Sequence, residues 1–299
     1  MNRPQLRIAC RQMAPVVGRP RENQRAAADA IAAAVSAGAR LVVLPELATS
    51  GYVFRSPEEV RSAALTRGSP VFEQWRALVS PADAVVIGGF PEAAPDGAFF
   101  NSAAVVGRQG LLAVYRKTHL WGDEKRWFRP GGDEPPVVTT PWGRVGVLVC
   151  YDLEFPELVR SLAIRGAEVV AVPTNWPLAP RPKGERPPEI INAMAAARLS
   201  RVFIACSDRV GTERGVEWTG GSCVVDCDGW VLAERAERDA GLIHADIDIA
   251  RARDKSLTDR NDVLGDRRPE LYGVLLDEVV APGAPGAPGS TRPDGSGAD

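Results

Sequence analysis

The sequence predicts an α/β fold built from layers of strands and helices, and three observations support this. Short apolar runs, such as residues 41–44 and 169–173, have the length of strands buried on both faces. Stretches of helical length separate these runs. The composition of the 299 residues, 45% hydrophobic and 25% charged, is that of an ordinary globular protein. Such alternation is typical of helices packed on a largely parallel sheet.

The expected elements follow one another along the chain as strand, helix and strand. Residues 6–10 form the first strand, and an Ala-rich helix over 22–39 follows, with Gly38 as its stop signal. Further strands are expected at residues 40–46, 84–90, 102–107, 111–117, 145–150, 168–174 and 201–207. Two later helices and a hairpin around an Asp-Gly turn are expected at residues 155–167, 189–200 and 220–234.

The expected domain organisation is one domain over residues 1–280 followed by a tail. No segment rich in Pro, Gly and Ser interrupts the first 280 residues. Residues 281–299 form a Pro-Gly low-complexity stretch that cannot bury enough surface to fold. We expect this stretch to be disordered, or to serve as an interaction tail.

Charge and hydropathy exclude several classes of function. The net charge of −2 provides no basic field for nucleic acid or an anionic membrane surface. No apolar run approaches the roughly 18 residues of a membrane span. The N-terminal segment becomes polar before a signal-peptide apolar region could form. We therefore expect a cytoplasmic protein without membrane or nucleic-acid partners.

Cysteine and histidine usage argues against disulfides and metal. The five cysteines are scattered along the chain, at positions 10, 150, 206, 223 and 227. A disulfide framework is unexpected in a chain of this size in a reducing compartment. The two histidines, His119 and His244, lie in no cluster with metal-ligand spacing. No metal site is expected.

Three apolar runs end in a reactive side chain, namely Glu46, Lys117 and Cys150. Each has a structural explanation when taken alone: a helix cap, a solvated lysine and a small buried hydrophobe. Together they supply a carboxylate, a cation and a thiol, which suffice for acyl transfer without histidine. In an open α/β sheet, ligands bind at the edge where strands end in this way.

The segments around these residues resemble a known family. "LPELATSGY", "YRKTHLW" and "CYDLEFPE" are similar, in this order, to the three signature segments of the nitrilase superfamily of carbon–nitrogen hydrolases. The resemblance runs from about residue 5 to about residue 275. It implies a four-layer α-β-β-α sandwich, with Glu46 as general base, Lys117 as electrostatic stabiliser and Cys150 as nucleophile. It implies no cofactor.

The resemblance also suggests further site residues. The family's second glutamate falls on Glu124, with the neighbouring Asp123 as the alternative. Asn175 and Trp176 would line the pocket, and Tyr52 is a weaker candidate for its wall. The backbone N–H of Tyr151 would meet the oxyanion together with the lysine.

Proton transfer from the thiol to the glutamate sets a physical requirement on the site. A free thiol has a pKa near 8.5 and a free glutamate near 4.3, a gap of roughly 4 units or about 5–6 kcal/mol. We expect burial to raise the pKa of Glu46 and the ammonium of Lys117 to lower that of Cys150. Both effects would narrow the gap.

Hydrolysis of a small linear amide to an acid and ammonia is the expected function. Nitrilases of the superfamily commonly follow the cysteine with Trp-Glu, whereas Tyr151-Asp152 resembles amidases and carbamoyl hydrolases. An N-carbamoyl amine or amino-acid amidohydrolase and a nitrilase remain alternatives. From other classes, the alternatives are a thiol hydrolase that uses His119 or His244, and a non-catalytic binding protein on the same fold.

A homodimer or higher homo-oligomer is expected from the resemblance, because family members pair across their outer helices. Those helices would span residues 155–167 and 189–200. The first is expected to expose Leu158, Leu162 and Ile164, and the second carries an Ala-rich apolar stripe. Two-fold homodimers are also the commonest soluble oligomers.

Overall fold

The computed structural model describes residues 5–235 and 239–277, which belong to two compact units. The first unit ends at Gly265 and contains both large sheets. The second unit begins at Asp266. Its described part contains two short 3-10 helices, η4 (Pro269–Leu271) and η5 (Gly273–Leu276).

The predicted domain boundaries stay a prediction. The division after Gly265 lies before the expected end of the domain at residue 280. The expected tail over 281–299 lies outside the described residues. Among the helices of the described segments, none combines the length and apolarity needed to cross a bilayer.

The first large sheet has six strands in the order β14-β1-β2-β3-β4-β5. Strands β1, β2 and β3 are parallel to one another, whereas β14 at one edge and β4 and β5 at the other are antiparallel additions. The strands span β1 (Leu6–Gln12), β2 (Leu41–Val43), β3 (Val85–Ala93), β4 (Phe99–Gly107), β5 (Gly110–Arg116) and β14 (Gly241–Ile247).

The second large sheet repeats this plan in the order β13-β12-β9-β8-β7-β6. Its central strands β7, β8 and β9 are parallel, and the outer pairings are antiparallel. The strands span β6 (Val137–Thr140), β7 (Gly143–Val147), β8 (Val169–Pro173), β9 (Phe203–Ser207), β12 (Cys223–Val225) and β13 (Val231–Glu234). Two small ribbons pair β10 (Thr212–Glu213) with β11 (Val216–Glu217), and β15 (Ser256–Thr258) with β16 (Asn261–Asp262).

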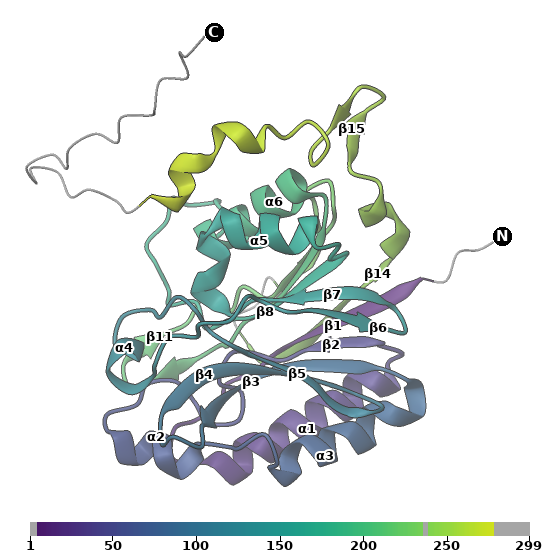
Figure 1. The fold of residues 1–299 in the computed structure, drawn as a ribbon. Coiled ribbons are helices and arrows are strands. Elements are labelled where there is room, and N and C mark those ends of the chain that lie inside the picture. Colours follow the sequence, from purple (N-terminus) through teal and green to yellow (C-terminus); the bar gives the residue numbers. More distant parts are fainter. Residues whose placement is uncertain (1–4, 236–238, 278–299) are drawn as a thin grey trace, which may run out of the picture. The chain divides into compact units, whose positions relative to one another are not determined.

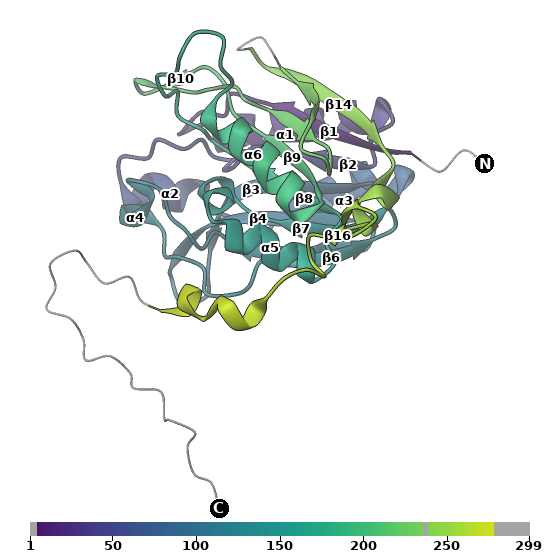
Figure 2. The same ribbon diagram turned by 90° about the horizontal axis from the view of Figure 1, so that it is seen from above.

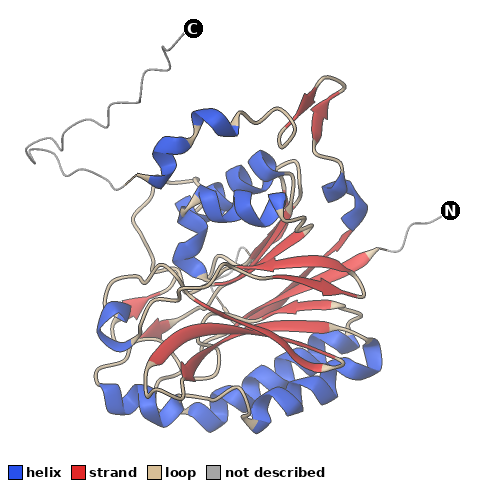
Figure 3. Ribbon diagram, viewed as in Figure 1, coloured by secondary structure: helices blue, strands red, loops and turns tan. Residues whose placement is uncertain are grey.

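Helices cover the outer faces of the two sheets (Figures 1 and 3). Helices α1 and α3 lie on the first sheet, and α5 and α6 lie side by side on the second (Figure 2). The helices span α1 (Pro20–Ser36), α2 (Pro57–Ala63), α3 (Pro70–Val79), α4 (Glu124–Trp127), α5 (Pro156–Ile164) and α6 (Pro188–Ser200). Three further 3-10 helices are η1 (Ser80–Ala82), η2 (Cys150–Glu154) and η3 (Ile249–Arg253). The order helix, sheet, sheet, helix confirms the predicted four-layer α-β-β-α sandwich.

The two sheets pack face to face, with β1 against β9 and β3 against β8. Every residue of β8 is buried, as expected for a strand covered on both faces. Because parallel strands end at the same edge, β2, β7, β8 and β9 deliver their next residues to one place. Glu46, Cys150, Asn175 and Asp208 follow these four strands. The fold therefore places these polar side chains together at one edge of the apolar core between the two sheets.

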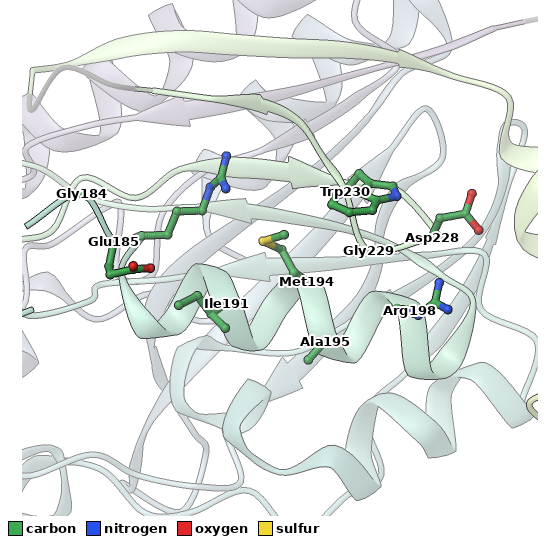
Figure 4. Close-up of a pocket in the computed structure, with 10 residues that line it drawn as sticks. Gly184, Glu185, Ile191, Met194, Ala195, Arg198, Asp228, Gly229 and Trp230 are labelled. Carbon is green, nitrogen blue, oxygen red and sulfur yellow. The ribbon is translucent and has the colours of Figure 1, made fainter. Parts of the chain in front are cut away.

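The outer face of α5 and α6 is partly apolar. Ile164, Ile191 and Leu199 are about half exposed, whereas Leu162 is fully buried against the second sheet. The expectation that Leu162 faces outward was wrong, because this position lies on the side of α5 that packs over Gly146. Figure 4 shows a hollow beside α6, with Met194 on one side and the exposed indole of Trp230 on the other.

Candidate active site

Two non-glycine residues at the strand ends have a left-handed backbone. Cys150 has a φ of +48°, and Leu47, directly after Glu46, has a φ of +49°. Such values are unusual for residues with a side chain, and they turn the chain sharply after the strand. Gly89 permits the turn at Glu46, because a Cβ at this glycine would lie 2.3 Å from the Leu47 nitrogen.

The ends of the two sheets are joined by hydrogen bonds at this edge. The backbone N–H of Glu46 donates to the Thr174 carbonyl, with an N–O distance of 3.4 Å. The Asn175 side chain returns a bond from its Nδ2 to the carbonyl of Glu46 at 2.9 Å. The backbone after β2 is therefore fixed against the backbone after β8.

The central feature is a buried ammonium between two carboxylates. Lys117 Nζ lies 2.7 Å from Glu46 Oε1 and 2.7 Å from Glu124 Oε1. Asn101 Nδ2 donates to Glu46 Oε1 at 2.7 Å, and the Tyr52 hydroxyl donates to Glu124. Glu46 Oε2, by contrast, is buried with no hydrogen-bond partner. One oxygen of Glu46 is thus held in place and the other is left free to take or give a proton.

Burial tunes the protonation of this cluster. It raises the pKa of Glu46 to about 7, against the opposing pull of the Lys117 charge and with a further rise from Glu124. Burial alone would lower the pKa of Lys117, but the carboxylates of Glu124 and Glu46 outweigh it and raise that pKa well above its ordinary value. The lysine therefore stays charged, and Glu46 is near its titration point at neutral pH.

Cys150 differs from the expectation. Burial raises its pKa well above the ordinary value, the charge of Glu46 raises it further, and Lys117 lowers it by less. Lys117 does lower the pKa of Cys150, as expected, but burial and the charge of Glu46 outweigh it, so the expected narrowing of the gap from the thiol side was wrong. The resting thiol is protonated, and its Sγ lies 3.8 Å from the Asn175 carbonyl.

The two candidates for the fourth carboxylate occupy different environments. Glu124 begins α4 and is only 3% exposed, in contact with Lys117. The side chain of Asp123 is 81% exposed and lies 3.8 Å from Arg126. Of the two, Glu124 alone contacts the lysine.

A cavity of about 300 Å³ opens onto the cysteine. Four of the candidate site residues line it, namely Cys150, Tyr151, Asn175 and Trp176. Tyr52 lies elsewhere: it borders a smaller neighbouring cavity and donates its hydroxyl to Glu124. The remaining lining residues, which the sequence reasoning missed, are Trp121, Glu154, Pro177 and Glu189.

His119 contacts the loop that carries the cysteine without bonding to its sulfur. Its Nδ1 lies 2.9 Å from Asp152 Oδ1, and its ring stacks on Phe155 at 3.5 Å between centroids. Asp152 also accepts a hydrogen bond from Tyr115, which anchors the turn after Cys150. The other histidine lies on β14, opposite Ala9 of β1. The contacts of His119 therefore support the turn after Cys150.

A second buried carboxylate, missed in the sequence, fixes the wall of the cavity. Asp208 accepts hydrogen bonds from the backbone N–H groups of Trp176, Arg209 and Gly221, at 2.8–2.9 Å. Burial raises its pKa to about 6, against the opposing effect of these donors. The indole of Trp176 is thus attached to a rigid loop. In the described residues, no group of three His, Cys, Asp or Glu side chains is arranged to hold a metal ion.

Comparisons with known proteins identify the family. The family model for carbon–nitrogen hydrolases matches residues 7–255. This chain belongs to the carbon–nitrogen hydrolase family. It is therefore an enzyme of the nitrilase superfamily, which sets aside the non-catalytic alternative and confirms the resemblance of the three signature segments.

Three similar proteins illustrate the range of this family. A protein of Pyrococcus abyssi named nitrilase is 37% identical over 89% of this chain and 99% of its own. An N-carbamoylputrescine amidase of Solanum lycopersicum is 30% identical over 82% and 87%. A crystal structure of an amidase from Nesterenkonia sp. has a TM-score of 0.74 and 31% identity, covering 91% of this chain and 97% of that one. A mutant of the latter shows covalent addition of the acetamide moiety of fluoroacetamide at its active-site cysteine.

Proposed function

We propose that this enzyme hydrolyses a small linear amide to a carboxylic acid and ammonia through an acyl-thioester on Cys150. The observation that carries the proposal is the buried Glu46–Lys117–Glu124 cluster, whose charges act on a thiol that lines a cavity. These groups are the ones that acyl transfer requires. The acetamide adduct on the cysteine of the Nesterenkonia amidase supports the same chemistry.

In the first step, Cys150 Sγ attacks the carbonyl carbon as its proton passes to Glu46 Oε2. The resting thiol is protonated and this oxygen has no other hydrogen-bond partner, so attack and proton transfer occur together. Negative charge then develops on the carbonyl oxygen. The ammonium of Lys117 and the backbone N–H of Tyr151 stabilise it without reorganisation, since both are already fixed.

In the second step, Glu46 returns the proton to the departing nitrogen. The C–N bond breaks, ammonia leaves and the acyl group remains as a thioester. Glu46, now a carboxylate again, takes a proton from water as the water oxygen attacks the thioester. Collapse of that intermediate releases the acid and restores the thiol. Glu124 holds Lys117 in place through both steps.

Release of ammonia from a panel of amides tests the proposal. Hydroxylamine present during turnover should divert the acyl group to a hydroxamate, and Cys150→Ala should abolish both products. Cys10→Ala, which removes another buried thiol in the core, serves as the matched control and should retain activity. Turnover by the Cys150→Ala protein, or an active enzyme that yields no hydroxamate, would contradict a thioester on Cys150.

A carbamoyl substrate is the second candidate, and the relatives named N-carbamoylputrescine amidase favour it. The same residues would then release carbon dioxide as well as ammonia. Measuring both gases distinguishes the two substrates. Nitriles belong in the same panel because of the relative named nitrilase, and efficient turnover of nitriles without amides would refute the argument from Tyr151-Asp152.

The cellular setting that we propose is the cytoplasm. All five cysteines are free thiols and all five are buried, which suits a reducing compartment. Fractionation of the native host tests this assignment. Recovery of the protein from an oxidising compartment would contradict it.

We also propose that two copies pair across α5 and α6. Ile164, Ile191 and Leu199 give this face apolar side chains that remain about half exposed in one copy. Light scattering should report twice the 32.0 kDa of the chain, and Leu199→Glu should shift it to the monomer. Leu257→Glu, at an exposed leucine of β15, is the matched control. A wild-type monomer at micromolar concentration would rule out the dimer.

A further inference from the structure

Two carboxylates, those of Glu154 and Glu189, line the same cavity as the cysteine. Glu154 ends η2, four residues after Cys150, and Glu189 lies in the first turn of α6. The other lining side chains are three aromatic residues, an asparagine and a proline, so none carries a positive charge. The cavity therefore contains both the candidate nucleophile and two acidic side chains.

This negative charge is only partly balanced by the protein. Glu189 Oε2 is buried with no hydrogen-bond partner. Burial raises the pKa of Glu189, and a backbone hydrogen bond and the charge of Arg181 act against this rise. Burial also raises the pKa of Glu154, followed by the charge of Glu189, while Asn192 opposes the rise. Among the described residues neither carboxylate forms a salt bridge, and the charge of Glu189 makes Glu154 less stable as an anion.

A second observation shows that the cavity is built for a polar ligand. Asn175 lines it, is only 1% exposed, and leaves its Oδ1 without a hydrogen-bond partner. Its Nδ2 is already used to hold the Glu46 carbonyl. A buried acceptor without a donor is costly, so a bound molecule with N–H groups is the natural partner.

We propose that the substrate carries a protonated amine, which Glu154 and Glu189 bind while its amide or carbamoyl carbon lies at Cys150. This inference rests on the proposed function and names its substrate class. An ammonium ion would pair with these carboxylates and remove the repulsion between them. The indoles of Trp121 and Trp176 line the same cavity, and indole rings attract cations.

The same wall would reject substrates that carry a carboxylate. An anion placed between Glu154 and Glu189 would meet like charge in a half-buried site, which weakens binding strongly. The cavity therefore discriminates between amide substrates by the charge of the end that lies away from the amide group. A neutral alkyl end would bind without this repulsion but would leave the carboxylates unpaired.

Steady-state kinetics on substrates of matched size test the inference. The series runs from 3-aminopropanamide to 6-aminohexanamide, and each member is paired with the neutral amide in which a methyl group replaces the ammonium. We expect the best aminoamide to exceed its neutral partner in kcat/KM by roughly 10- to 100-fold, the range of one charge-assisted hydrogen bond. The amide acids of the same lengths should be the poorest substrates.

Variants then assign the preference to the two residues. Glu154→Gln, Glu189→Gln and the double variant should bring the ratio of the kcat/KM of the aminoamide to that of the neutral amide progressively towards one. Glu157→Gln, at an exposed carboxylate that does not line the cavity, should keep the wild-type ratio. Unchanged ratios in all three Gln variants would overturn the inference.

The outcomes separate this inference from the proposed function. If no amide or carbamoyl compound is hydrolysed, the proposed function fails and the inference fails with it. If neutral amides are hydrolysed as well as their amino partners, only the inference fails. Since the wild-type comparison needs no variant, poor folding of a Gln variant leaves the test decisive.

Discussion

Replacing Glu46 by glutamine should change how the stability of the enzyme depends on pH. Burial raises the pKa of this carboxyl from 4.5 to about 7 in the folded protein. A group with a raised folded pKa contributes stability that is fully present below pH 4.5 and is lost as pH rises through 7. The difference spans about 2.5 pH units, so ionising Glu46 costs the folded state about 3 kcal/mol by pH 8.

The Glu46→Gln protein lacks this ionisation. Its free energy of unfolding, relative to that of the wild type, should therefore increase by about 3 kcal/mol between pH 4.5 and pH 8. Any constant effect of the amide on packing cancels in this comparison, because only the slope is used. Urea unfolding followed by circular dichroism at several pH values measures it.

A matched control and a kinetic profile complete the test. Glu58→Gln alters an exposed carboxyl whose pKa is lowered by hydrogen bonds, so its difference from wild type should not increase between pH 5.5 and 8. In the wild type, kcat/KM should rise with pH through about 7, since Glu46 must be ionised to take the thiol proton. If the difference in unfolding free energy between Glu46→Gln and the wild type did not change with pH, the raised pKa of Glu46 would be refuted.

Three further predictions follow from the site. Iodoacetamide should label Cys150 before the other four cysteines, because it lines a cavity and is 6% exposed whereas the others are 0% exposed, and peptide mass spectrometry would detect any other order. Lys117→Ala should lower kcat by about 10²–10³, whereas His119→Ala should keep most activity; an inactive but folded His119→Ala would favour the histidine mechanism. Asp208→Asn should lower the free energy of unfolding by about 1–3 kcal/mol and raise KM, since the amide nitrogen would face the Trp176 donor. Unchanged denaturation and kinetics would exclude this role of Asp208.

The fold was predictable where the sequence has clear apolar runs of strand length. Residues 169–173 form an apolar run of strand length, and all of them are buried in β8. The helices α2 and α3 were not predicted, although Ser56-Pro57 and Ser69-Pro70 are helix-start signals that precede them. Helix α2 buries only Val60 and Ala63, which is too few positions to show a helical period.

The predicted strand over 145–150 shows where local pattern fails. It ends at Val147, and Cys150 turns into a left-handed conformation although the apolar run continues. The apolar side chains of Leu148 and Val149 indicate that these residues are buried, but they do not indicate that the backbone leaves the sheet there. The turn depends on the carboxylate of Asp152, which accepts from the Val149 N–H at 3.1 Å.

The residues named from motifs and those found only in the structure differ in a physical way. Glu46, Lys117 and Cys150 each end an apolar run, so one segment at a time suffices to predict them. Glu154 and Glu189 are 35 positions apart and meet only through the packing of α6 over η2. The protonation of the thiol was also beyond the sequence, since its pKa depends first on how deeply Cys150 is buried and then on the charges of Glu46 and Lys117 around it.

That charge balance leads to a last prediction about the acylation step. The buried cluster already places two carboxylates on one ammonium, and the attack moves negative charge from Glu46 onto the carbonyl oxygen of the substrate in the cavity. A substrate ammonium bound at Glu154 and Glu189 would offset this charge; at a separation of about 8 Å and an effective dielectric constant of about 20, the gain is about 2 kcal/mol. Cationic amides should therefore show faster acylation as well as tighter binding. Rapid-quench measurement of the first turnover, at saturating aminoamide and at saturating neutral partner, should give rate constants that differ by about 30-fold. Equal rate constants with different KM values would mean that the carboxylates act in binding alone.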